Sequence, residues 1–201
     1  MIAKKAILAC CITLSPLTGA AQTLPEIARL HGGSANSMID IDSPLSKPVD
    51  LFAQADLVVH GRVTSVNTRL NADQTIVITE YKVTPFKAFK ERRTEGVPRP
   101  GMVEDIVVQR SGGNLVTPDG LHLSTTVNIF PDSEAFRVGE EVLLFLTYDA
   151  DSRSYRFTSG EFGAYRLRNG MAMLMTANAA QRRNDPPLTS AALFAELTRM
   201  R

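Results

Sequence analysis

The chain has 201 residues, a formal net charge of +1 and two cysteines. This length suits one domain with a single hydrophobic core. The near-neutral charge excludes a chain-wide electrostatic footprint for nucleic acid, so a polyanionic partner would need a local patch of cations.

The first 21 residues have the layout of a secretory signal peptide. Lys4 and Lys5 are basic, residues 6–17 are apolar and residues 19–21 are small. The apolar run is too short to anchor the chain stably across a membrane. We therefore expect residues 1–21 to be removed, and the mature protein to be exported to the periplasm or the medium without a transmembrane anchor.

Cleavage after Ala21 removes Cys10 and Cys11, which are the only cysteines. The mature protein then has no disulfide, thiolate nucleophile or cysteine metal ligand. Residues 7–10 loosely resemble a lipoprotein box with Cys10 as the lipidated residue. The apolar stretch before Cys10 is much shorter than the roughly 7–15 residues that a signal peptide uses, so export by cleavage is the preferred interpretation.

The first part of the mature chain is expected to be irregular. Residues 22–47 contain two prolines, a Gly-Gly-Ser sequence and little apolar periodicity, which predicts a flexible N-terminal arm. Residues 48–55 are compatible with a short helix that has Pro48 in its first turn. A strand follows at residues 57–63, where the apolar residues alternate with His60 and Arg62.

Closely spaced strands are expected over the rest of the chain. Residues 71–74 predict a turn into a strand at 75–83, which Pro85 should interrupt or bend, and residues 91–101 predict a polar loop. Residues 142–146 are apolar on both faces, which predicts the most buried strand. Further strands are expected at residues 105–110, 121–127, 141–148, 154–158, 164–168 and 171–176.

The end of the chain predicts a helix. Thr189 can cap it, and Leu193, Phe194 and Leu197 form an apolar stripe. Many short strands with helices only at the ends predict a mainly β protein, a small OB-like β-barrel with a short N-terminal helix and a C-terminal helix. We place the barrel domain at residues 48–180 and a linker with the helix at 181–201.

Four segments carry a family resemblance. They are Leu51–Val59 with Gly61 and Val63, Thr79–Val83 continuing to Phe86–Lys90, Gly139–Leu146, and Gly160–Tyr165. In order and spacing the first three resemble the netrin-like domain, the OB-type barrel of tissue inhibitors of metalloproteinases. The first, third and fourth also resemble a group of exported bacterial proteins that are largely without assigned function. The resemblance covers roughly residues 52–167 and implies the fold.

The resemblance does not carry the inhibitory mechanism. Inhibition in the animal family depends on an N-terminal cysteine that chelates the catalytic zinc within a disulfide-rich frame. The mature chain lacks that cysteine, and Ala53 stands where the inhibitors have another. Fold can therefore be inferred from the resemblance, but function cannot.

Histidine and methionine offer two possible metal sites. His31, His60 and His122 lie far apart without the spacing of paired ligands, so surface or edge positions are the ordinary interpretation. Met171, Met173 and Met175 alternate, and three thioethers on one strand face could bind Cu(I) or simply fill the core. We expect no cofactor, and leave the methionine alternatives open.

A basic stretch with two phenylalanines is the candidate contact surface. An OB-type barrel can bind single-stranded nucleic acid with such a combination, but an exported protein rarely meets that ligand and none is expected here. The alternatives are a solvated loop and a surface for an unknown protein or anionic partner. The possible partner-binding loop comprises Phe86, Lys87, Phe89, Lys90, Arg92, Arg93 and Arg99.

Catalytic motifs are absent from the sequence. It has no Gly-x-Ser-x-Gly elbow and no Walker-type or dinucleotide glycine loop, and Glu140 and Glu141 would point to opposite faces of a strand. We therefore expect an exported, non-catalytic binding or interaction module. The alternatives are a protease-associated, inhibitor-like domain without the cysteine wedge and a hydrolytic enzyme of unrecognised type.

Overall fold

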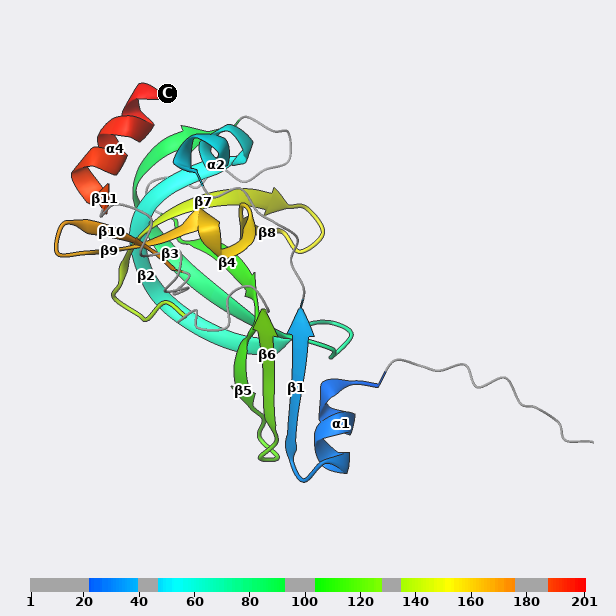
Figure 1. Ribbon diagram of the computed structural model, residues 1–201. Helices are drawn as coiled ribbons and strands as arrows, with labels where there is room; N and C mark the ends of the chain where they lie inside the picture. Colours follow the sequence, from blue (N-terminus) through cyan, green and yellow to red (C-terminus); the bar gives the residue numbers. More distant parts are fainter. Residues whose placement is uncertain (1–21, 40–46, 93–103, 128–134, 176–187) are drawn as a thin grey trace, which may run out of the picture.

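The computed structural model describes residues 22–39, 47–92, 104–127, 135–175 and 188–201, and it is mainly β (Figure 1). The helices are α1 (Leu24–Leu30), α2 (Pro48–Gln54), the short 3-10 helix η1 (Gly160–Gly163) and α4 (Ser190–Arg199). The strands are β1 (Ser34–Ile39), β2 (Leu57–Leu70), β3 (Val77–Glu91), β4 (Ile106–Ser111), β5 (Gly113–Val116), β6 (His122–Val127), β7 (Glu141–Asp149), β8 (Ser154–Phe157), β9 (Ala164–Arg168), β10 (Met171–Leu174) and β11 (Leu188–Thr189).

The larger sheet closes on itself. Its strand order is β11-β10-β9-β7-β2-β3-β4-β8, and β7 also pairs with β8. Five strands, β7, β2, β3, β4 and β8, therefore form a ring in which only the β4–β8 pair is parallel. This confirms the prediction of a mainly β, barrel-like protein with a short helix near its N-terminus and a helix at its C-terminus.

The ring is filled by alternate residues of its strands. On β2, Leu57, Val59 and Val63 point into the main core, as the two-residue period predicts. On β7 every residue from Val142 to Leu146 is buried, which confirms the most buried strand. It is buried on both faces because Leu143 and Phe145 pack in a second core outside the ring.

Two helices cover that outer core (Figure 1). From α2 it receives Leu51 and Phe52, and from α4 the fully buried Leu193 and Leu197. The Thr189 hydroxyl accepts a hydrogen bond from the Ala192 backbone N–H at 3.1 Å, which confirms the predicted cap. The outer face of the sheet therefore becomes a packed layer rather than a solvated surface.

The expectation of an irregular arm at residues 22–47 is wrong over residues 24–39, which form α1 and β1. Thr23 caps α1 through a capping box with Glu26, and Leu24 and Ala28 are buried. β1 then pairs in parallel with β6 in a small sheet of order β1-β6-β5, which projects from the barrel together with α1 (Figure 1). We call these four elements the lobe; residues 40–46 of the expected arm lie outside the described residues.

Pro85 shifts the register of β3 without ending the strand. In the pairing with β2, Gly61 lies opposite Pro85 and His60 opposite Lys87, so Phe86 is an extra residue on the β3 side. A bulge can accept proline because the ladder there needs no donor. Gly61 is required opposite it, since a Cβ on this residue would lie 2.5 Å from the Thr84 carbonyl oxygen.

Candidate partner-binding surface

The structure places most of the predicted partner-binding loop in a strand. Phe86, Lys87, Phe89 and Lys90 belong to β3, and Arg92 follows its last residue. The prediction of a loop is therefore wrong for residues 86–91, because β3 continues through the Phe86 bulge and a second bulge at Phe89. Arg93 and Arg99 lie outside the described residues.

Phe89 and Lys90 hold the covering helices against the barrel. The Phe89 side chain is buried, and its ring centroid lies 5.2 Å from that of Phe194 on α4. The Lys90 ammonium donates to the carbonyl oxygens of Phe52 at 2.5 Å and Ala53 at 3.0 Å, near the end of α2. These two residues of the predicted surface are therefore part of the scaffold.

The pKa of the Lys90 ammonium is lowered by its surroundings. Burial lowers the pKa of its ammonium, the nearby Arg92 charge lowers it further, and the Asp56 carboxylate opposes them. Arg92 itself reaches Asp56 with its guanidinium at 3.7 Å and is largely exposed. Arg92 therefore remains accessible to a partner, whereas Lys90 is committed to α2.

Phe86 is the exposed aromatic residue of the predicted set. Its side chain is 41 % exposed, and the His60 ring meets it edge-on at a centroid distance of 5.3 Å. The Arg62 guanidinium carbon lies 5.4 Å from the Phe86 ring centroid, within the range of a cation–π interaction. The bulge in β3 thus leaves an aromatic side chain on the surface with a cation fixed over it.

Lys87 lies beside Phe86 and is held in the same way. Its ammonium lies 4.5 Å from the centroid of the Phe89 ring. On the same outer face of the barrel, Lys82 is exposed between the inward-pointing Tyr81 and Val83. We call Arg62, Lys82, Phe86 and Lys87 the cation–aromatic surface.

Sequence reasoning identified Phe86 and Lys87 but missed Arg62 and Lys82. The two-residue alternation along β2 places Arg62 on the outer face of the sheet, so the sequence alone predicts the side of the strand on which it lies. Its position over Phe86 depends on the bulge, which the sequence pattern does not reveal. Lys82 falls within the predicted strand at residues 75–83, before the basic stretch, and its strand position gave no functional signal.

Two carboxylates border the cation–aromatic surface. Glu141 contacts His60, whose Nε2 lies 2.6 Å from the glutamate Oε1. Asp105 accepts hydrogen bonds from the Thr84 and Thr64 hydroxyls. Both acids are thus engaged by neighbours, and Arg62, Lys82 and Lys87 form no ion pair within the part of the chain that the structure describes.

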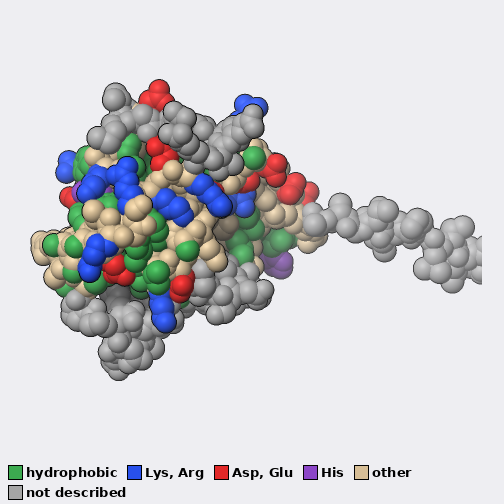
Figure 2. Space-filling model, turned by 90° about the horizontal axis from the view of Figure 1, so that it is seen from above, with side chains coloured by type: hydrophobic (Ala, Val, Ile, Leu, Met, Phe, Trp, Pro, Cys, Tyr) green, Lys and Arg blue, Asp and Glu red, His purple; other side chains and the backbone are tan. Residues whose placement is uncertain are grey.

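Lysine and arginine side chains are also plentiful on the side of the molecule that carries α2 and α4 (Figure 2). Figure 2 looks down on the side of the molecule that carries α2 and α4, and shows many basic side chains there among apolar ones. The acidic side chains visible in this view are more scattered.

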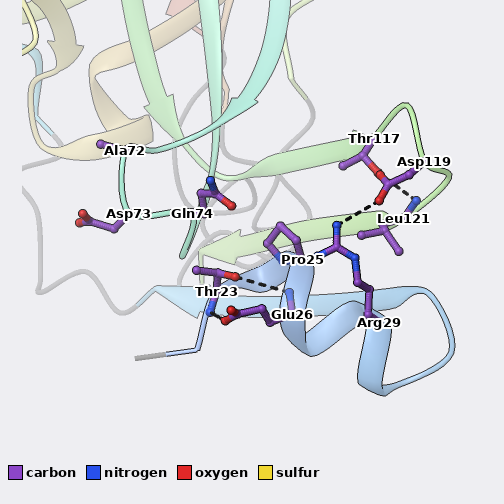
Figure 3. Close-up of a pocket in the computed structure, with 10 residues that line it drawn as sticks. All are labelled: Thr23, Pro25, Glu26, Arg29, Ala72, Asp73, Gln74, Thr117, Asp119 and Leu121. Atoms are coloured by element: carbon purple, nitrogen blue, oxygen red, sulfur yellow. Dashed lines mark hydrogen bonds and ion pairs between the residues drawn. The ribbon is translucent and has the colours of Figure 1, made fainter. Parts of the chain in front are cut away.

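A separate open groove of about 500 Å³ lies where the lobe meets the β2–β3 turn (Figure 3). In it Arg29 of α1 forms an ion pair with Asp119 at 3.1 Å, and the Thr23 backbone N–H donates to Glu26 at 2.9 Å. The groove is lined by Thr23, Pro25, Glu26, Arg29, Ala72, Asp73, Gln74, Thr117, Asp119 and Leu121.

The charged groups of this groove are largely satisfied by one another. The backbone hydrogen bond from Thr23 lowers the pKa of the Glu26 carboxyl, with smaller help from the Thr23 hydroxyl. The Thr117 hydroxyl, and then the Arg29 guanidinium, lower the pKa of Asp119. Of these bonds only the one between Arg29 and Asp119 links α1 to the turn between β5 and β6, whereas those of Thr23 and Glu26 stay within the cap of α1.

The possible metal ligands have separate environments. His31 ends α1, His60 pairs with Glu141, and His122 begins β6. Among the described residues no group of three or more His, Cys, Asp and Glu side chains could hold a metal ion. Met175 is fully buried in the barrel core while Met173 is exposed, so core packing accounts for Met175 alone.

Comparison with known proteins adds no relative. No family model matches the chain, and no curated protein is similar to it at a significant level. Across the described segments, no helix has the length and apolar character needed to span a membrane.

Proposed function

We propose that the protein is an exported, non-catalytic binding module, a netrin-like barrel of the OB type that contacts an anionic partner through the cation–aromatic surface. The observation that carries this proposal is Phe86, an exposed ring at a strand bulge with Arg62 fixed over it and Lys87 beside it. Export is supported by the layout of residues 1–21.

The OB-type assignment is supported by the topology of the ring. An OB barrel has five strands, and here β7, β2, β3, β4 and β8 close a ring of that size. The lobe strands β5 and β6 are inserted between β4 and β7. Proteins with this architecture bind through surfaces that lie on a rigid barrel, which is the arrangement of Phe86 on β3.

An anionic partner is supported by how the cations are held. A ring beneath Arg62 and another beside Lys87 restrict the side chains, so less rotamer entropy is lost when a partner binds. The exposed edge of Phe86 adds apolar contact area between the charges. Such a combination suits a surface that presents carboxylates or phosphates beside apolar groups.

Binding can be tested with vesicles of phosphatidylglycerol, with phosphatidylcholine vesicles as the neutral reference, and by pull-down from periplasm and medium with mass spectrometry of the captured molecules. The double variant Arg62→Gln/Lys87→Gln should lose most of the binding, and the loss should be greatest at low salt, where exposed charges are least screened. Arg168→Gln on β9 is the matched control, since Arg168 is also exposed on a strand. Equal binding by the double variant and the control would contradict the proposal.

The same experiments separate the alternatives. A protease captured from periplasm or medium, with its activity reduced, would support the inhibitor-like function. Turnover of a panel of hydrolase substrates would support an enzyme. Unchanged binding after charge reversal at Arg92 and Arg93, at low salt, would show that the end of the original basic stretch takes no part in the contact.

A further inference from the structure

Gln22 is the residue at which the mature chain would begin, and it lies just before the capped helix α1. Cleavage after Ala21 would make Gln22 the first residue, and Gln22 is exposed in the structure. Thr23, the next residue, is the N-cap of α1. We infer that Gln22 becomes pyroglutamate in the exported protein, an inference that rests on the proposed export and cleavage.

The reaction needs only the atoms of Gln22. The unprotonated α-amine attacks the side-chain amide carbon, a bond from nitrogen to Cδ forms, the bond from Cδ to Nε2 breaks, and ammonia leaves with the proton from the amine. The product is a five-membered lactam with no charge. An α-amino group has a pKa of about 7.7–8.0, so a fraction of it is already unprotonated near neutral pH.

The hydrogen bonds at the start of α1 are made by Thr23 and Leu24. The backbone N–H of Thr23 donates to Glu26, and that of Leu24 donates to the Gln74 carbonyl oxygen at 2.8 Å. These bonds begin one residue after Gln22, and ring closure changes neither the Gln22 carbonyl nor the Thr23 N–H. The capped start of α1 is therefore compatible with cyclisation.

Cyclisation also changes the charge at the groove of Figure 3. Thr23 lies on its wall, so a free ammonium at Gln22 would sit next to it. A lactam leaves the groove with the carboxylates of Glu26, Asp73 and Asp119 against the single guanidinium of Arg29. It also removes the free amine that aminopeptidases require, and so protects the capping residue Thr23 from trimming.

The test is intact-mass analysis and N-terminal sequencing of protein exported by a native or related host. We expect a mass one ammonia lower than that of a chain that starts at Gln22, resistance to stepwise N-terminal degradation, and resistance to an aminopeptidase. Gln22→Ala is the control, because alanine cannot cyclise; it should give an unblocked and digestible end.

The outcomes separate the two proposals. A chain that starts at Gln22 and keeps its free amine after prolonged storage overturns the modification and leaves export intact. A mature chain that starts at another residue overturns the modification site, again without affecting export. An uncleaved precursor, or a chain lipidated at Cys10, overturns the proposed processing itself.

Discussion

Arg110 and Glu161 form an ion pair at the wall of the barrel, with the arginine Nε 2.5 Å from the glutamate Oε1 and side chains only 9 % and 3 % exposed. Arg110 follows Ile106 and Val108 on the inward face of β4, and Glu161 belongs to η1. The pair therefore fastens η1, which leads into β9, to a strand of the ring. Burial raises the pKa of the neighbouring Tyr81 hydroxyl, and the Arg110 charge opposes that rise.

Removing one partner of this pair should destabilise the fold strongly. Glu161→Ala leaves the buried Arg110 guanidinium without its carboxylate, and we expect a loss of roughly 3–5 kcal/mol in the free energy of unfolding. Asp119→Ala breaks the exposed pair between Asp119 and Arg29 and should cost far less, because solvent screens this pair. Urea unfolding of both variants checks this, and equal losses would show that the buried pair has no special role.

Leu144 should be a major contributor to the core. Its side chain is 1 % exposed and lies between the β2 and β9 neighbours Val59 and Ala164. Leu144→Ala should cost roughly 2–5 kcal/mol, because a packed ring cannot collapse around the cavity. Leu30→Ala, at a residue 70 % exposed, should change stability by less than about 0.5 kcal/mol. A loss below about 1 kcal/mol for Leu144→Ala would contradict the central position of β7.

The Thr189 cap should control the attachment of α4. Thr189→Ala removes the acceptor for the Ala192 N–H and should cost about 0.5–2 kcal/mol. Thr189→Ser keeps the hydroxyl and should restore nearly all of it. Amide hydrogen exchange should show the loss first in α4 itself, and an unchanged exchange rate there would refute the role of the cap.

Alkaline pH should destabilise the protein through Tyr155. Burial raises the pKa of this hydroxyl to about 12, and the charge of Glu91 contributes. The native state thus holds the proton more tightly than the unfolded chain, in which the pKa of tyrosine is about 10. The resulting stabilisation is complete below about pH 10 and is lost as the pH rises through about 12.

The comparison with Tyr155→Phe isolates this effect. Urea unfolding in a series from neutral to alkaline pH should show the wild-type protein losing stability relative to the variant as the pH exceeds about 10. Tyr148→Phe on β7 is a second test, because the Tyr148 ring meets that of Tyr155 edge-on at a centroid distance of 5.3 Å and its charge helps to raise the pKa of Tyr155. This variant should keep most of the pH dependence, since burial is the larger cause. A parallel pH dependence in wild type and Tyr155→Phe would exclude Tyr155 as the cause.

The parts of the fold with strong local patterns could be predicted from the sequence. The doubly apolar run Val142–Leu146 and the stripe of α4 need no knowledge of their partners, and both are confirmed. The lobe could not be predicted in this way. β1 buries only Ala35 fully, and its partner β6 lies far along the chain, with Ser37 and Thr125 88 positions apart.

The candidate surface could also be predicted only in part from the sequence. The composition of residues 86–90 identified an aromatic and basic segment, but composition does not distinguish a loop from a bulged strand. Two extra residues in β3 decide that Phe86 is exposed and Phe89 is buried. The bulges themselves depend on pairing across β2, where Gly61 makes room for Pro85 and its neighbours.

Strand β7 has a consequence for the order in which the protein folds. It supplies neighbours to β2, β8 and β9, yet it begins only at Glu141. Because synthesis runs from the N-terminus, β2 and β4 are made before either strand has its second neighbour. Until the last third of the chain is made, two strand edges are open to pairing with other chains, so this is the stage at which the protein is most exposed to aggregation.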